Sequence, residues 1–453
     1  MRGLADRFLA ALARLVLRGF FRDIEVVGRE RLPEDRAVLV VANHFNALVD
    51  AVLVVLGMGR LPRFIAKAAL WQRGWARPFL WLAGLVPVHR AQDATDLSGN
   101  RSTFATCHEL LARGKTVALF PEGRVSEIPT VATVRTGAAR IALGAHQMGA
   151  KDLVIVPVGL MYEDKVALRS RALVRIGEPI DLDAELPRFV QAGQRADEGN
   201  QDAVRALTDE ISRRMRAVAP DYADAREASV LGRAAEIALR EHGRVPPPDV
   251  PLAAREALAQ RLARAPEAAR TRLLDALARY HLDLSLLGLL DPYLVGHYRA
   301  GRLARLLVAT AVRLALVAPL ALVGATVNAI PYWGVHWAGR VVRNPMLKAT
   351  ARMLAGVALF PPMWLLVAWL APWNAWWQRL AVIVAAPALG LVAVRALEHA
   401  VAVHRSWRGW ITLTERTDAL AQVRADRDQV VALVEEAEAL AQPAAPSGST
   451  AAW

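Results

Sequence analysis

Two long stretches without a charged residue restrict what this chain can fold into more than any other feature. One runs from Leu314 to Gly339 and the other from Met353 to Gln378, and each contains 26 residues. Both are longer than the ~20 apolar residues that cross a bilayer core. A large buried helical core is the alternative, but such cores rarely contain two successive runs of this length. The pattern therefore predicts an integral membrane protein.

A third apolar run, from Leu380 to Val394, contains only 15 residues. It fits a short span, a re-entrant segment or a packed helix, so we expect two or three membrane segments within residues 301–400. Tryptophans gather near the ends of these runs, as in the aromatic belts of membrane proteins. They are Trp333, Trp337, Trp364, Trp369, Trp373, Trp376 and Trp377.

The two ends of the chain have their own patterns. Residues 1–22 place Leu4, Phe8, Leu12 and Leu15 at helical spacing among charged residues. This predicts an amphipathic helix that lies on a membrane or packs on the next domain. Residues 401–441 predict a charged C-terminal helix, and the Pro, Ala, Ser and Gly residues of 442–453 predict a disordered tail.

The net charge of +13 is spread along the whole chain. No run of five or more basic residues occurs, and only five of the 56 basic residues are lysine. Nucleic-acid binding normally uses a clustered basic patch, so we expect no nucleic-acid partner. Dispersed positive charge in a hydrophobic chain fits an anionic membrane surface better. The single cysteine, Cys107, excludes an intramolecular disulfide, and no zinc-binding spacing occurs.

Residues 23–220 have the pattern of a globular domain in which strands alternate with helices. Short β-branched apolar runs predict buried strands, and stretches such as 102–113 and 136–148 predict helices. This alternation favours an α/β fold with a substantially parallel sheet. Residues 221–300 predict a further helical region, in which we find no candidate chemistry. The predicted strands are Ala37–Ala42, Thr116–Phe120, Leu153–Val158 and Ala172–Ile176.

A histidine and an aspartate follow the first of these strands, in the sequence Asn43-His44-Phe45-Asn46-Ala47-Leu48-Val49-Asp50. Asp50 comes at the start of a predicted helix, 51–56. Its carboxylate can accept a hydrogen bond from one ring nitrogen of His44 and leave the other nitrogen as a general base. An aspartate at a helix start also serves as an N-cap, so the pair alone leaves both roles open.

Three further blocks follow along the chain. The sequence Phe120-Pro121-Glu122-Gly123-Arg124 also leaves a predicted strand, and it combines a tight turn with a carboxylate and with a guanidinium that suits phosphate. An apolar run from Gly84 ends in His89 and Arg90, and a proline breaks the strand pattern of Val154–Gly159. About one residue in nine is arginine, so a nearby arginine is by itself weak evidence of function.

In this order, the four blocks resemble those of the glycerolipid O-acyltransferase family, which includes glycerol-3-phosphate and lysophosphatidic acid acyltransferases. The resemblance covers about residues 20–220 and implies a catalytic domain at 23–220 with a mixed, largely parallel sheet. It implies that His44 is the general base, that Asp50 orients it and that Arg90 binds the substrate phosphate. It also implies that one block lines the acyl-acceptor site, namely Phe120, Pro121, Glu122 and Gly123.

The chain departs from the common family pattern in two places. Five residues separate His44 from Asp50, where four are usual. The longer gap resembles a subgroup of larger, fungal-type glycerol-3-phosphate/dihydroxyacetone-phosphate acyltransferases, which also have hydrophobic segments after the catalytic domain. After FPEG the family often has Thr or Ser followed by Arg-Ser, whereas this chain has Arg124-Val125-Ser126. Arg124 and Arg135 are therefore both candidates for a phosphate-binding role.

The resemblance implies a membrane-bound enzyme of phospholipid biosynthesis that transfers a fatty acyl group from acyl-CoA or acyl carrier protein to glycerol 3-phosphate. Lysophosphatidic acid is the alternative acceptor. A thioester donor needs no enzyme nucleophile, and the chain has no G-x-S-x-G motif, metal cluster or nucleotide loop, so we expect no cofactor. A non-catalytic membrane scaffold or a transporter is the alternative from a different class, but no apolar run has a central acid or lysine.

We expect the protein in the inner, cytoplasmic membrane, with its catalytic domain facing the cytoplasm and membrane lipids around its apolar segments. Four basic residues lie between the first two apolar runs, which favours a cytoplasmic position for this connection. They are Arg340, Arg343, Lys348 and Arg352. A simple crossing by the first run would then put the catalytic domain on the other side, and a re-entrant first segment reconciles the two expectations.

Overall fold

The computed structural model describes residues 2–72, 74, 77–88, 99–191, 193–241, 248–295, 300–370, 375–415 and 417–441. They form two compact units. The first consists of Met1–Ala223 and Val335–Ala355, and the second of Asp224–Gly334 and Gly356–Trp453.

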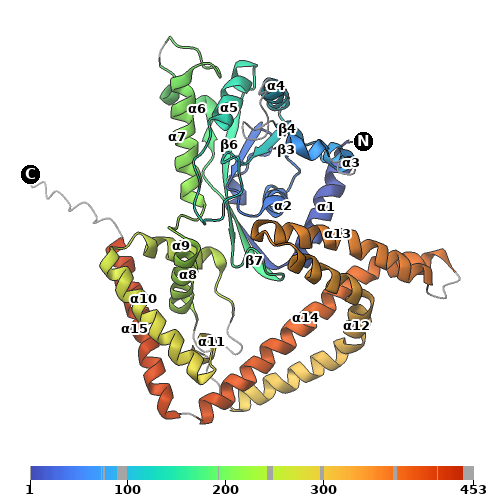
Figure 1. The fold of residues 1–453 in the computed structure, drawn as a ribbon, viewed down its shortest axis with the longest axis vertical. Helices are drawn as coiled ribbons and strands as arrows, with labels where there is room; N and C mark the ends of the chain where they lie inside the picture. The colour runs from blue at the N-terminus through green and yellow to red at the C-terminus, as the bar shows by residue number, and fades with distance from the viewer. Residues whose placement is uncertain are drawn as a thin grey trace, which may run out of the picture. The chain divides into compact units, whose positions relative to one another are not determined.

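The first unit is built on a sheet whose strands lie in the order β1-β7-β6-β2-β5-β3-β4, with β8 paired to β6 (Figure 1). All pairs are parallel except those of β6 with β7 and with β8. The predicted α/β fold with a mixed, largely parallel sheet and a following helical part is confirmed. The strands are β1 (Phe21–Val27), β2 (Val38–Ala42), β3 (Arg63–Lys67), β4 (Val86–Val88), β5 (Thr116–Leu119), β6 (Val154–Tyr162), β7 (Ser170–Ile176) and β8 (Ile180–Asp181).

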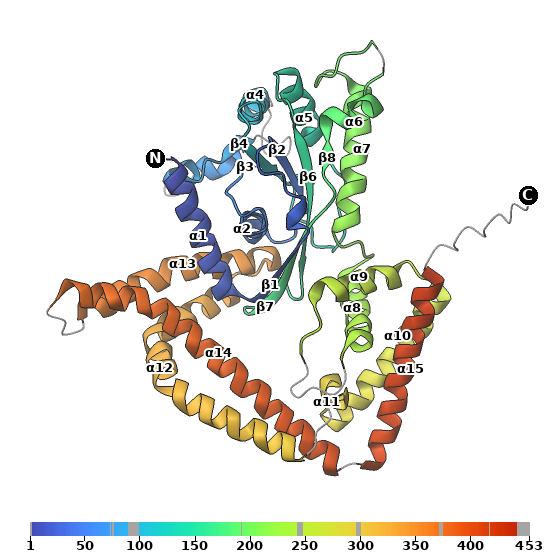
Figure 2. The same ribbon diagram turned by 180° about the vertical axis from the view of Figure 1, so that it is seen from behind.

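Helices cover both faces of this sheet, so β2 is buried along its whole length (Figure 2). Successive side chains of a strand point to opposite faces. Leu39 and Val41 accordingly pack with α4 (Gly99–Ala112), α5 (Gly137–Gln147) and α7 (Gln201–Val218). Val38 and Val40 pack with α1 (Arg2–Phe20) and α2 (Ala47–Met58). The first unit also contains the short helices η1 (Arg29–Arg31), η2 (Ala68–Gln72), α3 (Arg77–Leu82) and α6 (Leu182–Phe189).

Pro157 does not break the strand pattern that it interrupts, because β6 continues through it to Tyr162. Proline lacks the N–H that a ladder needs. Pro157 lies between Ile155, where β6 pairs with β8, and Val158, where its pairing with β7 begins. The position without an N–H donor therefore lies where the strand paired with β6 changes from β8 to β7.

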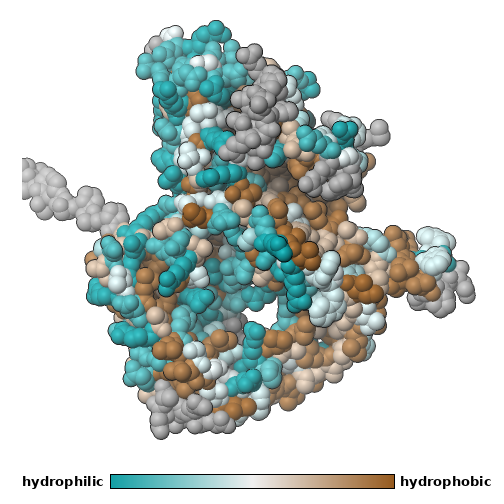
Figure 3. All heavy atoms as spheres, viewed as in Figure 1, coloured by the Kyte–Doolittle hydropathy of each residue, from teal (hydrophilic) through white to brown (hydrophobic). Residues whose placement is uncertain are grey.

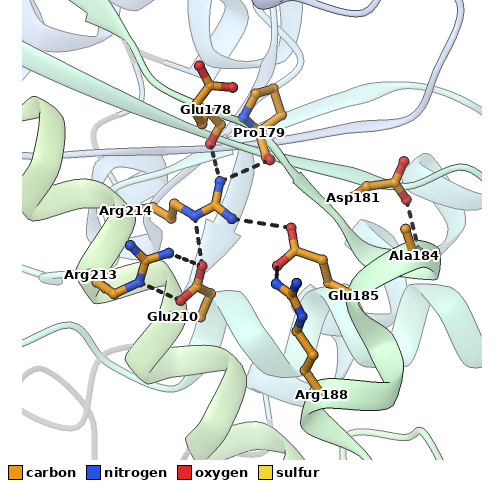
Figure 4. Close-up of polar contacts among 9 residues, drawn as sticks. All are labelled: Glu178, Pro179, Asp181, Ala184, Glu185, Arg188, Glu210, Arg213 and Arg214. Carbon is orange, nitrogen blue, oxygen red and sulfur yellow. Dashed lines mark hydrogen bonds and ion pairs between the residues drawn. The ribbon is translucent and has the colours of Figure 1, made fainter. Parts of the chain in front are cut away.

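Arg214 connects α7 to α6 and to the turn before β8 (Figure 4). Its Nε donates to Glu210 over 2.7 Å, one Nη donates to the carbonyl oxygens of Glu178 and Pro179 over 3.3 Å each, and the other Nη donates to Glu185 over 3.3 Å. Isolated surface ion pairs contribute little to stability, whereas a half-buried network with several partners contributes more. This network holds α7 against α6 and the turn before β8.

Helix α1 presents two apolar faces. Leu17 and Phe20 are buried against the sheet and α2, which fits the expectation that this helix packs on the domain. Leu4 and Phe8 on its other face are 74% and 65% exposed. Helix α1 thus packs on the domain with one apolar face and leaves a second apolar face exposed.

The second unit is helical. Among the described residues, three helices are long and apolar enough to cross a membrane, and few of their side chains are buried. Figure 3 shows hydrophobic residues over these helices. The third apolar run lies inside a helix that continues to Glu415, so residues 401–415 extend that helix. The helices after residue 223 are α8 (Ala225–Leu239), α9 (Leu252–Ala263), α10 (Glu267–Leu287), α11 (Asp291–Val295), α12 (Ala300–Val341), α13 (Pro345–Leu370), α14 (Trp376–Glu415) and α15 (Thr417–Ala441). The end of α12, from Val335, and the start of α13, to Ala355, belong to the first unit.

A polar node joins the three apolar helices. The side-chain amide of Asn328 in α12 donates to the carbonyl oxygen of Ala386 in α14 over 3.2 Å, and its oxygen accepts from the indole of Trp364 in α13 over 2.8 Å. Gly324 lets α12 approach α14, since a Cβ there would collide with the carbonyl of Leu389. Small residues and buried amides are the usual means of joining helices in lipid.

The predicted helical region 221–300 packs with the C-terminal helix through a buried ionic cluster. Asp291 accepts from Arg240 and Arg427 over 2.9 Å each and from the Tyr280 hydroxyl over 2.8 Å. These residues connect α8, α10, α11 and α15. The predicted tail, 442–453, lies outside the described residues.

Candidate active site

The candidate site lies where three neighbouring strands end. β2 is parallel to β5 on one side and to β6 on the other, with Val41 opposite Leu119 and Ala42 opposite Val158. The carboxyl ends of parallel strands meet at the same edge of a sheet, where α/β proteins commonly bind their ligands. The sheet therefore brings together the histidine block after β2, the FPEG block after β5 and the end of β6.

His44 and Asp50 form a hydrogen-bonded pair. The distance from His44 Nδ1 to Asp50 Oδ2 is 2.8 Å, and the Asp50 side chain has no exposed surface. Asp50 Oδ2 also accepts from the backbone N–H groups of Phe45 and Asn46 over 2.8 and 2.6 Å. With Nδ1–H donated to the carboxylate, Nε2 of His44 carries the lone pair. No described residue forms a hydrogen bond with Nε2, so this nitrogen is free to accept a proton.

The capping role considered for Asp50 is not what the structure shows. Helix α2 begins at Ala47 and not at residue 51, its N-cap is Asn46, and Asp50 is its fourth residue. Asp50 binds the loop before the helix because Ala47 adopts a positive φ of 43°, a conformation that costs a non-glycine residue roughly 1–2 kcal/mol. Ala47 turns the chain between His44 and Asp50. The Asp50 carboxylate can therefore reach the His44 ring, although it comes six positions later in the sequence.

Glu122 holds the backbone of the loop between β2 and α2, residues 43–46, which we call the histidine loop. Its side chain accepts from the N–H of His44 over 3.0 Å and from the N–H of Ala132 over 3.2 Å, and the residue is 2% exposed. The carbonyl oxygen of His44 in turn accepts from the N–H of Ser126 over 2.7 Å. Burial raises the pKa of Glu122, although both N–H donors oppose this shift. The carboxyl group thus contacts protein backbone at the point where the resemblance implied a substrate contact.

The rest of the FPEG block shapes the site around His44. The ring of Phe120 stacks on the imidazole with centroids 4.0 Å apart and planes 10° from parallel. Pro121 is buried, and its carbonyl accepts from the N–H of Arg135. Gly123 has φ +70°, and a Cβ there would lie 3.1 Å from Nε of Arg135. Only glycine both adopts this turn without strain and leaves room for that arginine.

Arg124 and Arg135 are exposed next to this turn. Within the described part of the chain, neither side chain has an ion-pair or hydrogen-bond partner. Two guanidinium groups are therefore available to an anion on the segment after β5, whose Glu122 and Ser126 bind the backbone of His44. Arg90 and His89 lie outside the described residues, so the expected role of Arg90 stays a prediction.

The sequence analysis missed Tyr162 and the two asparagines of the histidine block. The Tyr162 hydroxyl, at the end of β6, donates a short hydrogen bond to Asp50 Oδ1. Burial, followed by the charge of Asp50, raises the pKa of Tyr162 well above its usual value, so the phenol stays protonated. Asn43 bonds both backbone groups of Leu160, over 3.0 and 2.7 Å. No signal in the sequence marked Tyr162, because the predicted strand ended at Val158 whereas β6 continues to Tyr162.

Other groups with possible chemistry lie elsewhere. Cys107 is fully buried, and desolvation raises its pKa to about 12, so it is no nucleophile at neutral pH. His108 is buried against Gly144. Among the residues that the structure describes, no group of three or more His, Cys, Asp or Glu side chains could hold a metal ion.

Comparisons with known proteins identify the family. The family model "Acyltransferase" matches residues 23–161. The chain is 33% identical over 117 residues to glycerol-3-phosphate O-acyltransferase 1 of Saccharomyces cerevisiae, a match that covers 26% of this chain and 15% of the yeast protein. It is 31% identical over 172 residues to the 1-acyl-sn-glycerol-3-phosphate acyltransferase of Bacillus subtilis, which covers 37% of this chain and 76% of that protein.

Among solved structures, the 1-acyl-sn-glycerophosphate acyltransferase of Thermotoga maritima aligns with a TM-score of 0.31 and 21% identity, over 45% of this chain and 79% of that one. The match to most of the Bacillus protein, together with the family model over the unit that holds the His–Asp pair, decides the assignment. The chain belongs to the glycerolipid acyltransferase family.

Proposed function

We propose that this protein transfers a fatty acyl group from a thioester, acyl-CoA or acyl carrier protein, to the hydroxyl of glycerol 3-phosphate in phospholipid biosynthesis. The observation that carries the proposal is the hydrogen-bonded pair of His44 and the buried Asp50. Two exposed arginines, Arg124 and Arg135, lie on the segment after β5, which binds the His44 backbone through Glu122 and Ser126.

The residues suit a single-displacement acyl transfer. His44 Nε2 takes the proton of the acceptor hydroxyl as its oxygen attacks the thioester carbonyl carbon. The carbon–sulfur bond then breaks, and the departing thiolate takes the proton from His44. Asp50 holds the ring and favours the imidazolium that exists between these steps. Phe120 covers one face of the ring, which limits its rotation.

The acceptor phosphate would bind to arginine. Arg124 and Arg135 are exposed beside the FPEG turn, and Arg90 is the third candidate from the family resemblance. Guanidinium groups bind phosphate through paired charge-assisted hydrogen bonds. Of the expected acceptor-site block, Phe120 stacks on the His44 ring and Glu122 binds the His44 backbone. Pro121 and Gly123 form the turn next to Arg135.

Lysophosphatidic acid is the second candidate acceptor. The Bacillus relative, of which the chain matches 76%, has the name of a 1-acyl-sn-glycerol-3-phosphate acyltransferase. The five-residue His–Asp gap favours the glycerol 3-phosphate assignment instead. Offering purified protein each acceptor in turn, with acyl-CoA and with acyl carrier protein as donors, separates the two and identifies the donor.

Asp50→Asn tests the mechanism. The asparagine oxygen keeps the hydrogen bonds from His44 and the loop, and its amide can donate to the Tyr162 oxygen, so the variant should fold. Loss of the charge should lower turnover severely, and His44→Ala should lower it by the ~10²–10⁴-fold typical of a general base. Wild-type turnover in a folded Asp50→Asn protein would contradict the mechanism and leave Asp50 as a support of the loop. Membrane-inserted protein inactive with every acceptor would favour the scaffold alternative.

For the membrane, we propose the inner membrane with the catalytic domain facing the cytoplasm. Ala349 and Met353, at the start of α13, are buried in the cluster that contains β2 and α2. This packing supports a position of the basic connection before α13 on the same side of the membrane as the catalytic domain. Among the described residues before α12, no helix is long and apolar enough to cross a membrane. Both ends of α12 would then lie on one side, which makes α12 re-entrant.

A further inference from the structure

The turn between β6 and β7, residues 163–169, contacts both the histidine loop, residues 43–46, and α13, the second apolar helix. On one side, the Asn46 side-chain amide donates to the carbonyl oxygen of Lys165 over 2.7 Å, while the Asn46 backbone N–H donates to Asp50. On the other side, an Nη of Arg352 in α13 donates a short hydrogen bond to the carbonyl oxygen of Val166. The carbonyl of Lys165 thus binds the histidine loop, and the next carbonyl, that of Val166, binds α13.

The turn is internally braced, so its two sides cannot move independently. The Asp164 carboxylate accepts from the N–H groups of Val166 and Ala167 over 2.7 and 2.9 Å. The N–H of Asp164 donates to the Ser170 hydroxyl over 2.9 Å. The Lys165 ammonium also donates to the carbonyl of Glu127, in the segment after FPEG, over 3.3 Å. A displacement of Val166 therefore displaces Lys165 and the carbonyl that holds Asn46.

The path of Arg352 to this turn is built into the packing of the first unit. Ala349 and Met353, on either side of it along α13, are 0% and 3% exposed within the cluster that includes α2. Gly339, near the end of α12, leaves space for the side chain, since a Cβ there would collide with its guanidinium. Nε of Arg352 is buried without a hydrogen-bond partner in the described part of the chain. Burying a charged nitrogen without a partner is costly, so the half-buried Arg352 depends on its bond to the Val166 carbonyl.

We propose that Arg352 is a positioning residue that acts through the β6–β7 turn on Asn46 and hence on the His44–Asp50 pair. The start of α13 then helps to position the His44–Asp50 pair and also leads into the membrane. This inference rests on the proposed catalytic role of His44. A purely structural role for Arg352, which would only hold α13 against the domain, is the reading to be separated from it.

The experiment compares Arg352→Ala with Arg343→Ala in the full chain in nanodiscs. Arg343 is an exposed arginine nine positions earlier, without a partner in the described structure, and serves as the matched control. Arg352→Ala should lower kcat roughly three- to thirtyfold and leave both KM values unchanged, because no substrate contact is lost. Arg343→Ala should retain the wild-type kcat, and Arg352→Lys should recover part of the loss. An unchanged kcat in folded Arg352→Ala would overturn the proposal.

A double-mutant cycle with Asn46→Ala identifies the route. Asn46 makes no side-chain capping bond to α2, so this substitution removes chiefly its link to Lys165. If Arg352 acts through that link, the double variant should lose much less than the product of the two single losses. A loss equal to the product would show that Arg352 does not act through Asn46 and would overturn the proposed route.

Hydrogen exchange tests the same connection without turnover. The amides of Phe45 and Asn46 should exchange faster in Arg352→Ala and at the wild-type rate in Arg343→Ala. Gly339→Ala, which displaces the guanidinium but keeps the residue, should also speed exchange and serves if Arg352→Ala fails to fold. Unchanged exchange in both variants would defeat the proposal. Faster exchange in a protein that acylates no acceptor would instead refute the proposed function and leave the connection intact.

Discussion

Asp50 receives hydrogen bonds from four donors, and only one of them, the Tyr162 hydroxyl, comes from outside the histidine loop. We expect Tyr162→Phe to lower kcat about tenfold, since hydrogen bonds to charged groups are typically worth ~1.5–3 kcal/mol and Asp50 would lose its fixed position. Steady-state kinetics should show little change in either KM. Tyr280→Phe is the matched control, because it removes a similar bond to Asp291 in the other unit. Equal losses of kcat in both variants would contradict a specific role for Tyr162.

Glu122 should make the stability of the first unit depend on pH in a direction that follows from its raised pKa. Because burial raises its pKa above the ordinary 4.5, the folded protein holds this proton more tightly than the unfolded chain does. Its contribution to the free energy of unfolding is therefore full below pH 4.5 and falls as pH rises through the raised value. Thermal unfolding between pH 4.5 and 7 should show this decline in wild type. The decline should be smaller in Glu122→Gln, and parallel curves would contradict the assignment.

At the scale of elements, the Asn328 node predicts how the apolar helices hold together. Asn328→Leu removes hydrogen bonds to α13 and α14 at once, and such bonds in membranes are worth about 0.6–1.7 kcal/mol each. The melting temperature in detergent should fall measurably. Thr326→Val is the control, because the Thr326 hydroxyl bonds only within α12, to Leu322. If Thr326→Val lowers the melting temperature as much, the node has no special role.

Elements that are buried on both faces could be predicted from the sequence, and those with a mixed surface could not. The four predicted strands all exist, because continuous β-branched runs such as Val38–Ala42 are typical of buried parallel strands. The β1 strand was missed since its charged residues, among them Asp23 and Glu25, mask its period. The family blocks pointed to His44, Asp50 and Glu122. The contact of Glu122 with two backbone N–H groups and the contact of Tyr162 with Asp50 depend on loop geometry and strand register, which have no side-chain signature.

For the whole molecule, the proposed re-entrant α12 makes a labelling prediction. The native thiol, Cys107, is buried with a pKa of about 12, so single introduced cysteines can be read without background. Thiols from Gly301→Cys and Val341→Cys, at the two ends of α12, should both react with an impermeant maleimide from the cytoplasmic side. A thiol from Trp376→Cys, at the start of α14, should not react from that side. Reaction of positions 301 and 341 from opposite sides would show that α12 crosses.

The donors around the two site carboxylates have one more consequence, for how this enzyme should be dissected. Both donors to Glu122 and two of the four to Asp50 are peptide N–H groups, which remain whatever side chain occupies those positions. A scan of side chains would therefore leave the amides of Phe45 and Ala132 in place and could not measure how they hold the histidine loop. Replacing those amides by ester linkages through semisynthesis deletes single donors and leaves every side chain in place. Such backbone editing, and not residue replacement, is the approach that would measure what holds His44 in position.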